Sequence, residues 1–243
     1  MTTSAQTRHT DWQHWRDERD ALATAPYGPA ALIGTHWLDP QPLHIDGVPG
    51  EWIASDGRAV GTAPDFHLAL APGEEHRIGN LLLRTIIRAG QIALRVFDPH
   101  AATRSDLLGI DTFAYDPTWA VSGIRETTSA PLQLEHIDGF VSENTGSAIH
   151  LTLNARNITL EGTRTPDGGL QIVFADTTNG QQTQRFRFLT LPAPTPDGHT
   201  EIDFNRAHLP PCTFSDHFLC PLPPPANRLN FPILAGETRL RRG

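Results

Sequence analysis

Hydrophobic and polar residues alternate along much of this chain, and the alternation predicts short β-strands. Turn residues separate the strands, and Ala89-Gly90 is typical of a hairpin turn. The segments expected to form strands are residues 30–37, 80–88, 91–98, 120–126, 131–136, 149–153, 157–164, 170–175 and 184–191, and the alternation is found in the last four. We expect the strands at 120–126 and 131–136 to pair with each other. Short strands at near-regular spacing favour an antiparallel meander that closes into a barrel-like or strongly curved sheet.

One α-helix is predicted near the N-terminus, over residues 10–24. Thr10 is a plausible N-cap and Pro26 ends the helix. The residues that recur at helical spacing are Trp12, Trp15, Arg19 and Leu22. We expect the tryptophans to hold this helix against the β-sheet.

The segment at residues 201–237 is rich in proline and contains both cysteines of the chain. Proline fixes φ and lacks an N–H group, so this segment cannot continue as a regular strand or helix. We expect an ordered loop that folds back over the mouth of the curved sheet, where functional groups often lie. The whole chain, 1–243, is expected to form a single mainly β domain, because no alternation of helices and strands indicates a parallel sheet.

Polar side chains in this segment are the first candidates for a functional site. On a strand, Asp203 and Asn205 would share one face and could orient a substrate or accept a proton. They could equally cap the turns that organise the proline-rich loop. Arg206 or Arg228 could hold a substrate carboxylate, or instead bind loop carbonyls. The sequence leaves these alternatives open.

A further candidate is Arg187, which follows the Asn179-Gly180 turn. The simplest expectation is a cross-strand ion pair with Asp176, and at an exposed site such a pair contributes little to stability. The alternative is that Arg187 binds a ligand at the mouth of the barrel.

Two histidines and two cysteines could together bind a metal ion. His208, Cys212, His217 and Cys220 have the spacing H-x3-C-x4-H-x2-C, and two imidazoles with two thiolates suit tetrahedral zinc. The alternatives are two buried thiols with hydrogen-bonded histidines, or a disulfide. We expect no cofactor and treat zinc as the less favoured alternative.

Composition narrows the classes of function. The chain has 38% hydrophobic and 19% charged residues and a formal net charge of −8, which argues against a nucleic-acid partner. Lysine is absent, so Schiff-base chemistry and a P-loop lysine are excluded. No Gly-x-Gly-x-x-Gly or Cys-x-x-Cys motif indicates a nucleotide or redox cofactor. No signal peptide or membrane span is visible, so we expect a cytoplasmic protein without a membrane partner.

The C-terminal motifs resemble those of DUF1684, a family of uncharacterised bacterial proteins. The matching pieces are DFNRA (203–207), PPC (210–212), CPLPPPANRL (220–229) and AGE (235–237), with looser similarity at 15–19, 26–28, 36–38 and 174–189. Family members typically carry Tyr-Gly-x-Gly-Arg-Tyr where this chain has glycine-free residues 184–188. They more often have an aromatic residue at the positions of His208 and His217, which lowers the expectation of zinc as a family property. The resemblance implies no catalytic role.

The leading hypothesis is a small-molecule enzyme of hydrolase, lyase or cyclase type that acts in a β-barrel pocket. Asp203 and His208 would be its catalytic residues, because an imidazole or a desolvated carboxylate can transfer protons near neutral pH. The residues that would bind its substrate are Arg187, Asn205, Arg206 and Arg228. The alternative is a non-catalytic small-ligand-binding β-barrel protein, and a third possibility is a structural zinc or disulfide staple. The sequence does not indicate an oligomeric state.

Overall fold

The computed structural model describes residues 2–126 and 131–243, and these are mainly β-structure with one long N-terminal helix, α1 (Thr2–Thr24). The chain divides into two compact units. Unit 1 consists of Met1–Ala21, Leu108–Thr213 and Leu219–Arg241, and unit 2 of Leu22–Leu107, Phe214–Phe218 and Arg242–Gly243. The expectation of a single domain stays a prediction, because this division does not say whether either unit folds alone.

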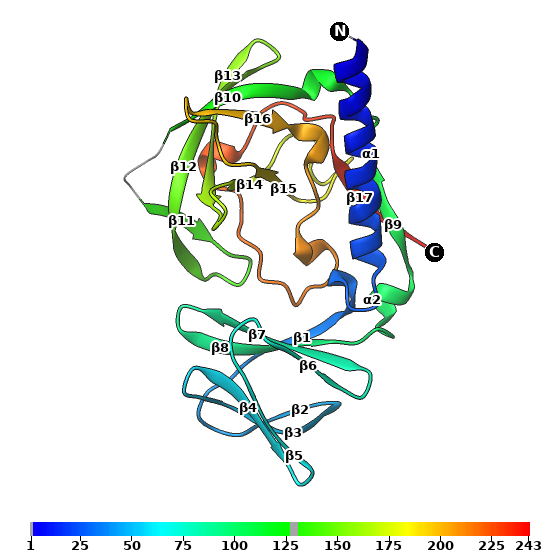
Figure 1. The fold of residues 1–243 in the computed structure, drawn as a ribbon, viewed down its shortest axis with the longest axis vertical. Helices are drawn as coiled ribbons and strands as arrows, with labels where there is room; N and C mark the ends of the chain where they lie inside the picture. Colours follow the sequence, from blue (N-terminus) through cyan, green and yellow to red (C-terminus); the bar gives the residue numbers. More distant parts are fainter. Residues whose placement is uncertain (1, 127–130) are drawn as a thin grey trace. The chain divides into compact units, whose positions relative to one another are not determined.

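The centre of unit 1 is an antiparallel sheet that is strongly curled into a half-barrel (Figure 1). Its strands are β10 (Ala120–Glu126), β11 (Pro131–Glu135), β12 (Val141–Leu153), β13 (Arg156–Arg164), β14 (Leu170–Phe174), β15 (Arg187–Leu191) and β16 (His199–Asp203). Their order is β15-β14-β13-β12-β10-β16, and β11 pairs with the first part of β12. This arrangement confirms the predicted fold class.

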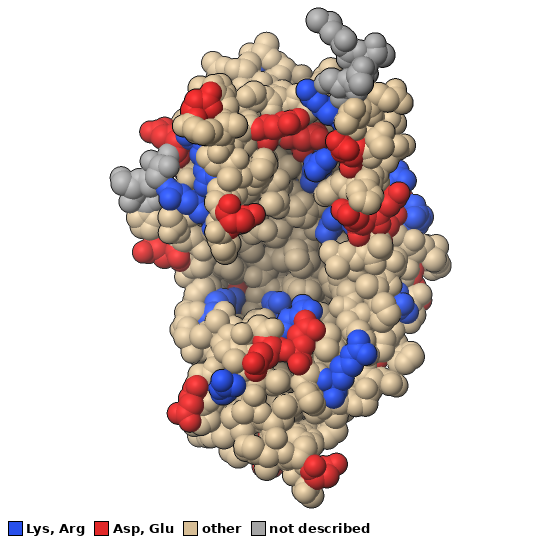
Figure 2. Space-filling view, viewed as in Figure 1, with Lys and Arg blue, Asp and Glu red and all other residues tan. Residues whose placement is uncertain are grey.

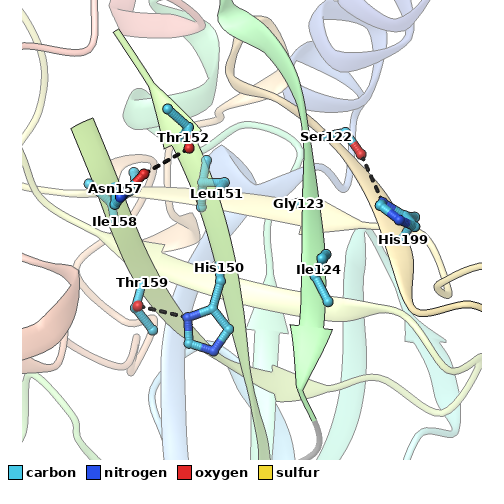
Figure 3. A pocket seen from close by; sticks show the side chains of 10 residues that line it. All are labelled: Ser122, Gly123, Ile124, His150, Leu151, Thr152, Asn157, Ile158, Thr159 and His199. Carbon is cyan, nitrogen blue, oxygen red and sulfur yellow. Dashed lines mark hydrogen bonds between the residues drawn. The ribbon is translucent and has the colours of Figure 1, made fainter. Parts of the chain in front are cut away.

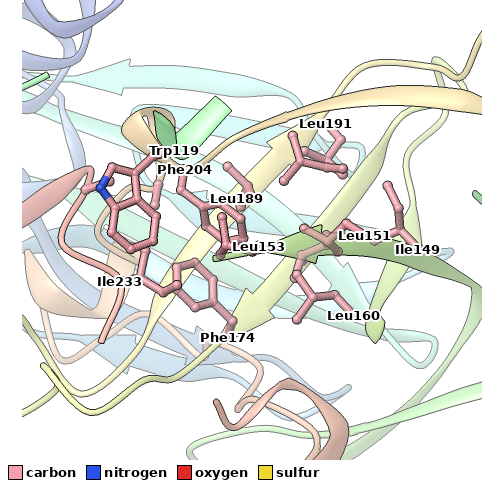
Figure 4. Close-up of a cluster of buried hydrophobic side chains, with 14 of the residues drawn as sticks. Trp119, Ile149, Leu151, Leu153, Leu160, Phe174, Leu189, Leu191, Phe204 and Ile233 are labelled. Atoms are coloured by element: carbon pink, nitrogen blue, oxygen red, sulfur yellow. The ribbon is translucent and has the colours of Figure 1, made fainter. Parts of the chain in front are cut away.

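Alternating side chains along each strand fill the inside of the half-barrel. On β12, Ile149, Leu151 and Leu153 are buried, whereas His150 and Thr152 point outward. The buried core of unit 1 contains Trp119, Ile149, Leu151, Leu153, Leu160, Leu170, Ile172, Phe174, Leu189, Leu191, Ile202, Phe204, Ala207, Phe231, Ile233 and Ala235 (Figure 4). The segment at residues 201–237 supplies the last six of these, and the interior of the half-barrel is packed with apolar side chains.

Helix α1 and a two-stranded ladder complete unit 1. The ladder joins β9 (Leu107–Thr112) to β17 (Glu237–Arg242), and α1 lies alongside both in Figure 1. Trp12 is buried and its indole Nε1 donates to the carbonyl of Asn205 at 3.0 Å, which confirms that this tryptophan holds the helix in place. None of the described helices is long and apolar enough to cross a membrane.

Unit 2 contains two four-stranded antiparallel sheets. One has the order β1-β8-β7-β6 and the other β2-β3-β4-β5. The strands are β1 (Leu32–Trp37), β2 (Leu43–Ile45), β3 (Val48–Ser55), β4 (Arg58–Ala63), β5 (Phe66–Leu70), β6 (Glu75–Ile78), β7 (Leu81–Arg88) and β8 (Gln91–Phe97); the short helix α2 covers Ala102–Ser105. A shared apolar cluster around the buried Trp52 and Leu83 draws on both sheets. The predicted hairpin at Ala89-Gly90 is present, with φ of 51° and 81°.

The structure corrects two details of the predicted helix. Helix α1 begins at Thr2, so Thr10 lies inside it and donates its hydroxyl to the carbonyl of Gln6 instead of capping the N-terminus. Leu22 is 55% exposed and is not part of a buried stripe. The helix is polar on most sides, which left its first turns without a periodic signal.

The strand pairing also differs from the prediction. β10 and β11 do not pair with each other, because both pair with β12. β12 is thirteen residues long, and its polar first half gave no apolar alternation. β15 begins at Arg187 and not at residue 184 as predicted. Strands β2–β6, β9, β16 and β17 were not predicted from the sequence. Most of these strands are short and half-exposed, so local patterning marks them poorly.

Candidate functional site

The end of β16 organises the polar residues predicted from the sequence. Asp203 is the last residue of β16, and Phe204–Arg206 forms a 3-10 turn. The Asp203 carboxylate accepts hydrogen bonds from the backbone N–H and the side-chain amide of Asn205, at 3.0 and 2.8 Å. Asp203 and Asn205 therefore do not share a strand face. Asp203 caps the turn, as one of the two sequence interpretations expected.

Asn205 is buried and its amide is fully engaged. It accepts from the backbone N–H of Asp116 at 3.1 Å and donates to the Asp116 carbonyl at 2.9 Å. These bonds join the turn after β16 to the loop that precedes β10. The structure thus gives Asn205 a positioning role.

Asp203 and Arg206 line a pocket of about 210 Å³. Its other lining residues are Arg8, Asp11, Thr190, Leu191, Pro192 and Glu201, so α1, β16 and the end of β15 all contribute. The pocket has two guanidinium groups and three carboxylates. We call it the Asp203 pocket.

The ion pairs across the Asp203 pocket are long. Arg206 Nε lies 3.8 Å from Asp203 Oδ2, and Arg8 Nη1 lies 4.0 Å from Glu201 Oε1. Charge-assisted hydrogen bonds are normally about 2.7–2.9 Å long. Because the two members of each pair lie farther apart than this, their charged groups can still form hydrogen bonds with a polar ligand.

Tyr115 lies beside the same charges. Its ring packs against Trp12 and His9 of α1, with centroid separations of 5.4 and 5.1 Å. Its hydroxyl is buried, and no hydrogen-bond partner for it is found in the described part of the chain. Burial, followed by the negative charge of Asp203, raises the pKa of Tyr115. The sequence gave no signal for this residue, because its neighbours come from distant segments.

His208 lies outside the Asp203 pocket lining and is paired through its backbone with Phe188 on β15. The N–H of each donates to the carbonyl of the other at 2.8 Å, and the two rings meet edge to face at 6.0 Å. His208 is partly exposed, but its densely packed surroundings lower its pKa to about 4, with a further contribution from the charge of Arg19. The imidazole is therefore neutral at pH 7, which does not favour the expected acid–base role.

Arg187 is completely buried. Its Nη2 donates to Asp176 Oδ2 at 2.6 Å and to the Ile233 carbonyl at 2.9 Å, and its Nη1 donates to the Ala235 carbonyl at 2.5 Å. The predicted ion pair is present, and both side chains are 0% exposed, so the small contribution of an exposed pair does not apply to it. Arg187 joins β15 to the C-terminal segment.

A second buried ion pair anchors α1. Arg19 donates from Nε and Nη2 to the two carboxylate oxygens of Glu237, at 2.7 and 2.9 Å. Glu237 is 1% exposed, and it also accepts from the backbone N–H of Leu209 at 2.7 Å. The sequence alone did not indicate this pair, although both residues lie in segments that resemble the family.

Asn227 holds the proline-rich loop against the sheet, and Arg228 binds a carbonyl of the loop, as one of the two interpretations of Arg228 expected. The buried Asn227 amide bonds to backbone groups of Glu161 and Val173, at 2.7–2.8 Å. Arg228 is exposed, and its Nε donates to the Pro223 carbonyl at 3.3 Å. Arg228 is not among the residues that line the Asp203 pocket.

The four candidate zinc ligands are not gathered into one cluster. In residues 2–126 and 131–243 there is no group of three or more His, Cys, Asp or Glu side chains that could hold a metal ion. Cys212 and Cys220 are thiols, and the backbone N–H of Cys212 donates to Cys220 Sγ at 3.2 Å. His217 belongs to unit 2, where burial, followed by the charge of His217, lowers the pKa of His36.

A wider hollow of about 410 Å³ lies on the outer face of the half-barrel (Figure 3). Strand pairing aligns His199, Ile124, His150 and Thr159 across four neighbouring strands. The His150 ring bonds to the hydroxyl of Thr159, and the ring of His199 approaches Ser122 at 3.4 Å. Only the observed register brings these residues together, so the sequence could not indicate the hollow.

The comparisons with known proteins agree with the sequence motifs. The family described as a protein of unknown function, DUF1684, matches residues 105–238. The chain belongs to this family.

No curated protein matches it. Among solved structures, it is similar to an uncharacterized protein of Haloarcula marismortui determined by NMR in solution. That similarity has 27% sequence identity, a TM-score of 0.45, and coverage of 54% of this chain and 76% of the other. The DUF1684 match includes Asp203 and Arg206 but not Arg8 and Asp11, which α1 supplies.

Proposed function

We propose that this DUF1684 protein binds a small polar molecule in the Asp203 pocket. The observation that carries the proposal is the pair of long, incompletely formed ion pairs that face this pocket, Arg206 with Asp203 and Arg8 with Glu201. A ligand that reached both kinds of charge would replace weak contacts with short charge-assisted hydrogen bonds.

The lining suggests the class of ligand. Arg8 and Arg206 suit a carboxylate or another planar anion, because guanidinium groups bind such groups through two parallel hydrogen bonds. Asp11, Glu201 and Asp203 suit an ammonium group or hydroxyl groups. The volume of about 210 Å³ is below the range of roughly 300–1,000 Å³ typical of drug-sized ligands. We therefore propose a small zwitterionic metabolite, such as an amino acid or an amino-acid derivative.

Binding is preferred to catalysis because two of the expected substrate-binding residues, Asn205 and Arg187, are buried in structural hydrogen bonds. The expected catalytic His208 is not among the residues that line the pocket and is neutral near pH 7. Catalysis of hydrolase, lyase or cyclase type remains the second candidate. It is favoured by the Asp203 carboxylate, which lines the pocket and could accept a proton from a bound ligand.

The setting of this function is part of the proposal. We propose a cytoplasmic, bacterial protein that acts on a small molecule, without a nucleic-acid or membrane partner. The net charge of −8 supports this, and acidic and basic side chains are interspersed on the face shown in Figure 2. Two cysteines present as thiols also suit a reducing compartment.

The test is a calorimetric screen of amino acids and hydroxy acids against the full chain, followed by variants. For a ligand that binds, Arg206→Ala should weaken the affinity about tenfold or more, because a hydrogen bond to a charged group contributes about 1.5–3 kcal/mol. Arg185→Ala is the matched control, since Arg185 is an exposed arginine outside the Asp203 pocket. Equal affinity of the two variants for every ligand found would refute the assignment of the site.

A further inference from the structure

The two cysteines of the chain lie close enough to react with each other. The backbone N–H of Cys212 donates to Cys220 Sγ at 3.2 Å. Because backbone N and Cα are about 1.46 Å apart, Cys220 Sγ lies within about 4.7 Å of Cys212 Cα. Cys220 Sγ is therefore within reach of the Cys212 side chain. Rotation of that side chain should bring the two sulfurs towards bonding distance.

The backbone on both sides of the pair is fixed. Cys212 lies in the 3-10 turn Pro211–Thr213, which the bond from the Thr213 N–H to the Pro210 carbonyl closes at 2.9 Å. The carbonyl of Cys220 accepts from the N–H of Ile137 at 3.0 Å. Prolines adjoin both cysteines and restrict the chain further. These restraints hold the two residues together whether or not they are bonded.

The two thiols differ in accessibility. Cys212 is partly exposed, whereas Cys220 is 4% exposed. The N–H directed at Cys220 Sγ would stabilise negative charge on that sulfur. This combination suits a pair in which the outer thiol meets an oxidant and the inner thiol completes the reaction.

We propose that Cys212 and Cys220 form a reversible redox site that is oxidised by small-molecule disulfides. The Cys212 thiolate attacks one sulfur of the small disulfide, which releases one thiolate and leaves a mixed disulfide on Cys212. Cys220 loses its proton to solvent and attacks Cys212 Sγ, so that a second small thiolate leaves. Two protein thiols are thereby oxidised to one disulfide, and one small disulfide is reduced to two thiols. This inference does not depend on the proposed ligand.

The test is a redox titration of the full-length wild-type protein with mixtures of glutathione and glutathione disulfide. After alkylation, intact-mass analysis should show a monomer that has lost two hydrogen atoms, and peptide mapping should join Cys212 to Cys220. Dithiothreitol should restore both thiols. The oxidised fraction should not depend on protein concentration, because the bond is intramolecular.

Single variants test the order of the two steps without requiring an intramolecular bond. Cys220→Ser should accumulate the mixed disulfide of Cys212 with glutathione, and Cys212→Ser should be glutathionylated at least tenfold more slowly, since its remaining thiol is buried. The proposal is overturned if the wild-type protein keeps two thiols in excess glutathione disulfide, or forms only disulfide-linked dimers. Equal glutathionylation rates of the two variants would overturn the assigned order.

Discussion

The pairing of Arg19 with Glu237 makes a quantitative prediction about how helix α1 is held. Arg19→Ala removes both side-chain hydrogen bonds from a carboxylate that is 1% exposed. Removing one partner of a buried ion pair typically costs about 3–5 kcal/mol, since the other charge is left buried. Arg19 is itself 19% exposed, so water can partly replace it. We therefore expect a loss near the lower end, about 3 kcal/mol of unfolding free energy.

The assay is urea unfolding at pH 7, followed in parallel by tryptophan fluorescence and far-UV circular dichroism. With a denaturant slope of about 3 kcal/mol/M for a chain of this size, the midpoint should fall by about 1 M. Arg241→Ala is the control, since Arg241 forms an exposed pair with Asp111 at 3.3 Å and should cost under about 1 kcal/mol. If Arg19→Ala and Arg241→Ala shift the midpoint equally, the buried pair does not anchor the helix as described.

Three further predictions concern the surroundings of the half-barrel. His208 has a pKa of about 4 in the folded protein, below its usual 6.5, so the unfolded chain binds a proton more tightly and protonation favours unfolding. The unfolding free energy should therefore be highest above pH 6.5 and fall by up to about 3 kcal/mol towards pH 4. His208→Gln should flatten this dependence in pH-dependent urea melts, whereas the exposed-residue control His199→Gln should retain it. Asn227→Ala should cost about 3 kcal/mol, since it removes three hydrogen bonds that the buried Asn227 amide makes to β13 and β14. Asn230→Ala at an exposed site should be nearly neutral by calorimetry. Gly123→Ala should cost about 1–3 kcal/mol, because its methyl group would approach a neighbouring isoleucine to 2.6 Å; unchanged thermal stability would contradict this.

The alternation of apolar and polar residues and the turn residues between strands predicted those strands that pair with a neighbour in sequence. The hairpin at Ala89-Gly90 and strands β13 to β15 combine apolar alternation with turn residues, and each pairs with a neighbour in sequence. The polar half of β12 has no such alternation and could not be recognised. The pairing of β10 with β16 joins strands that are far apart in sequence, so only the folded chain reveals it.

The candidate site was predictable only in part for the same reason. Asp203 and Arg206 were identified because they lie in a distinctive motif, but Arg8 and Asp11 join them from a helix almost the whole chain away. The burial of Arg187 depends on carbonyl groups of the C-terminal segment, whose path local sequence patterns do not determine. Residue types therefore identified candidates, and the tertiary structure separated structural residues from those that face the pocket.

A crystal structure of the full chain grown with a mixture of amino acids would show whether the Asp203 pocket binds a small zwitterionic molecule. We expect electron density in that pocket, with one charged end on Arg206 or Arg8 and the other on Asp203. Density confined to the outer hollow between His150 and His199, with Arg206 and Asp203 closed into direct contact, would contradict it.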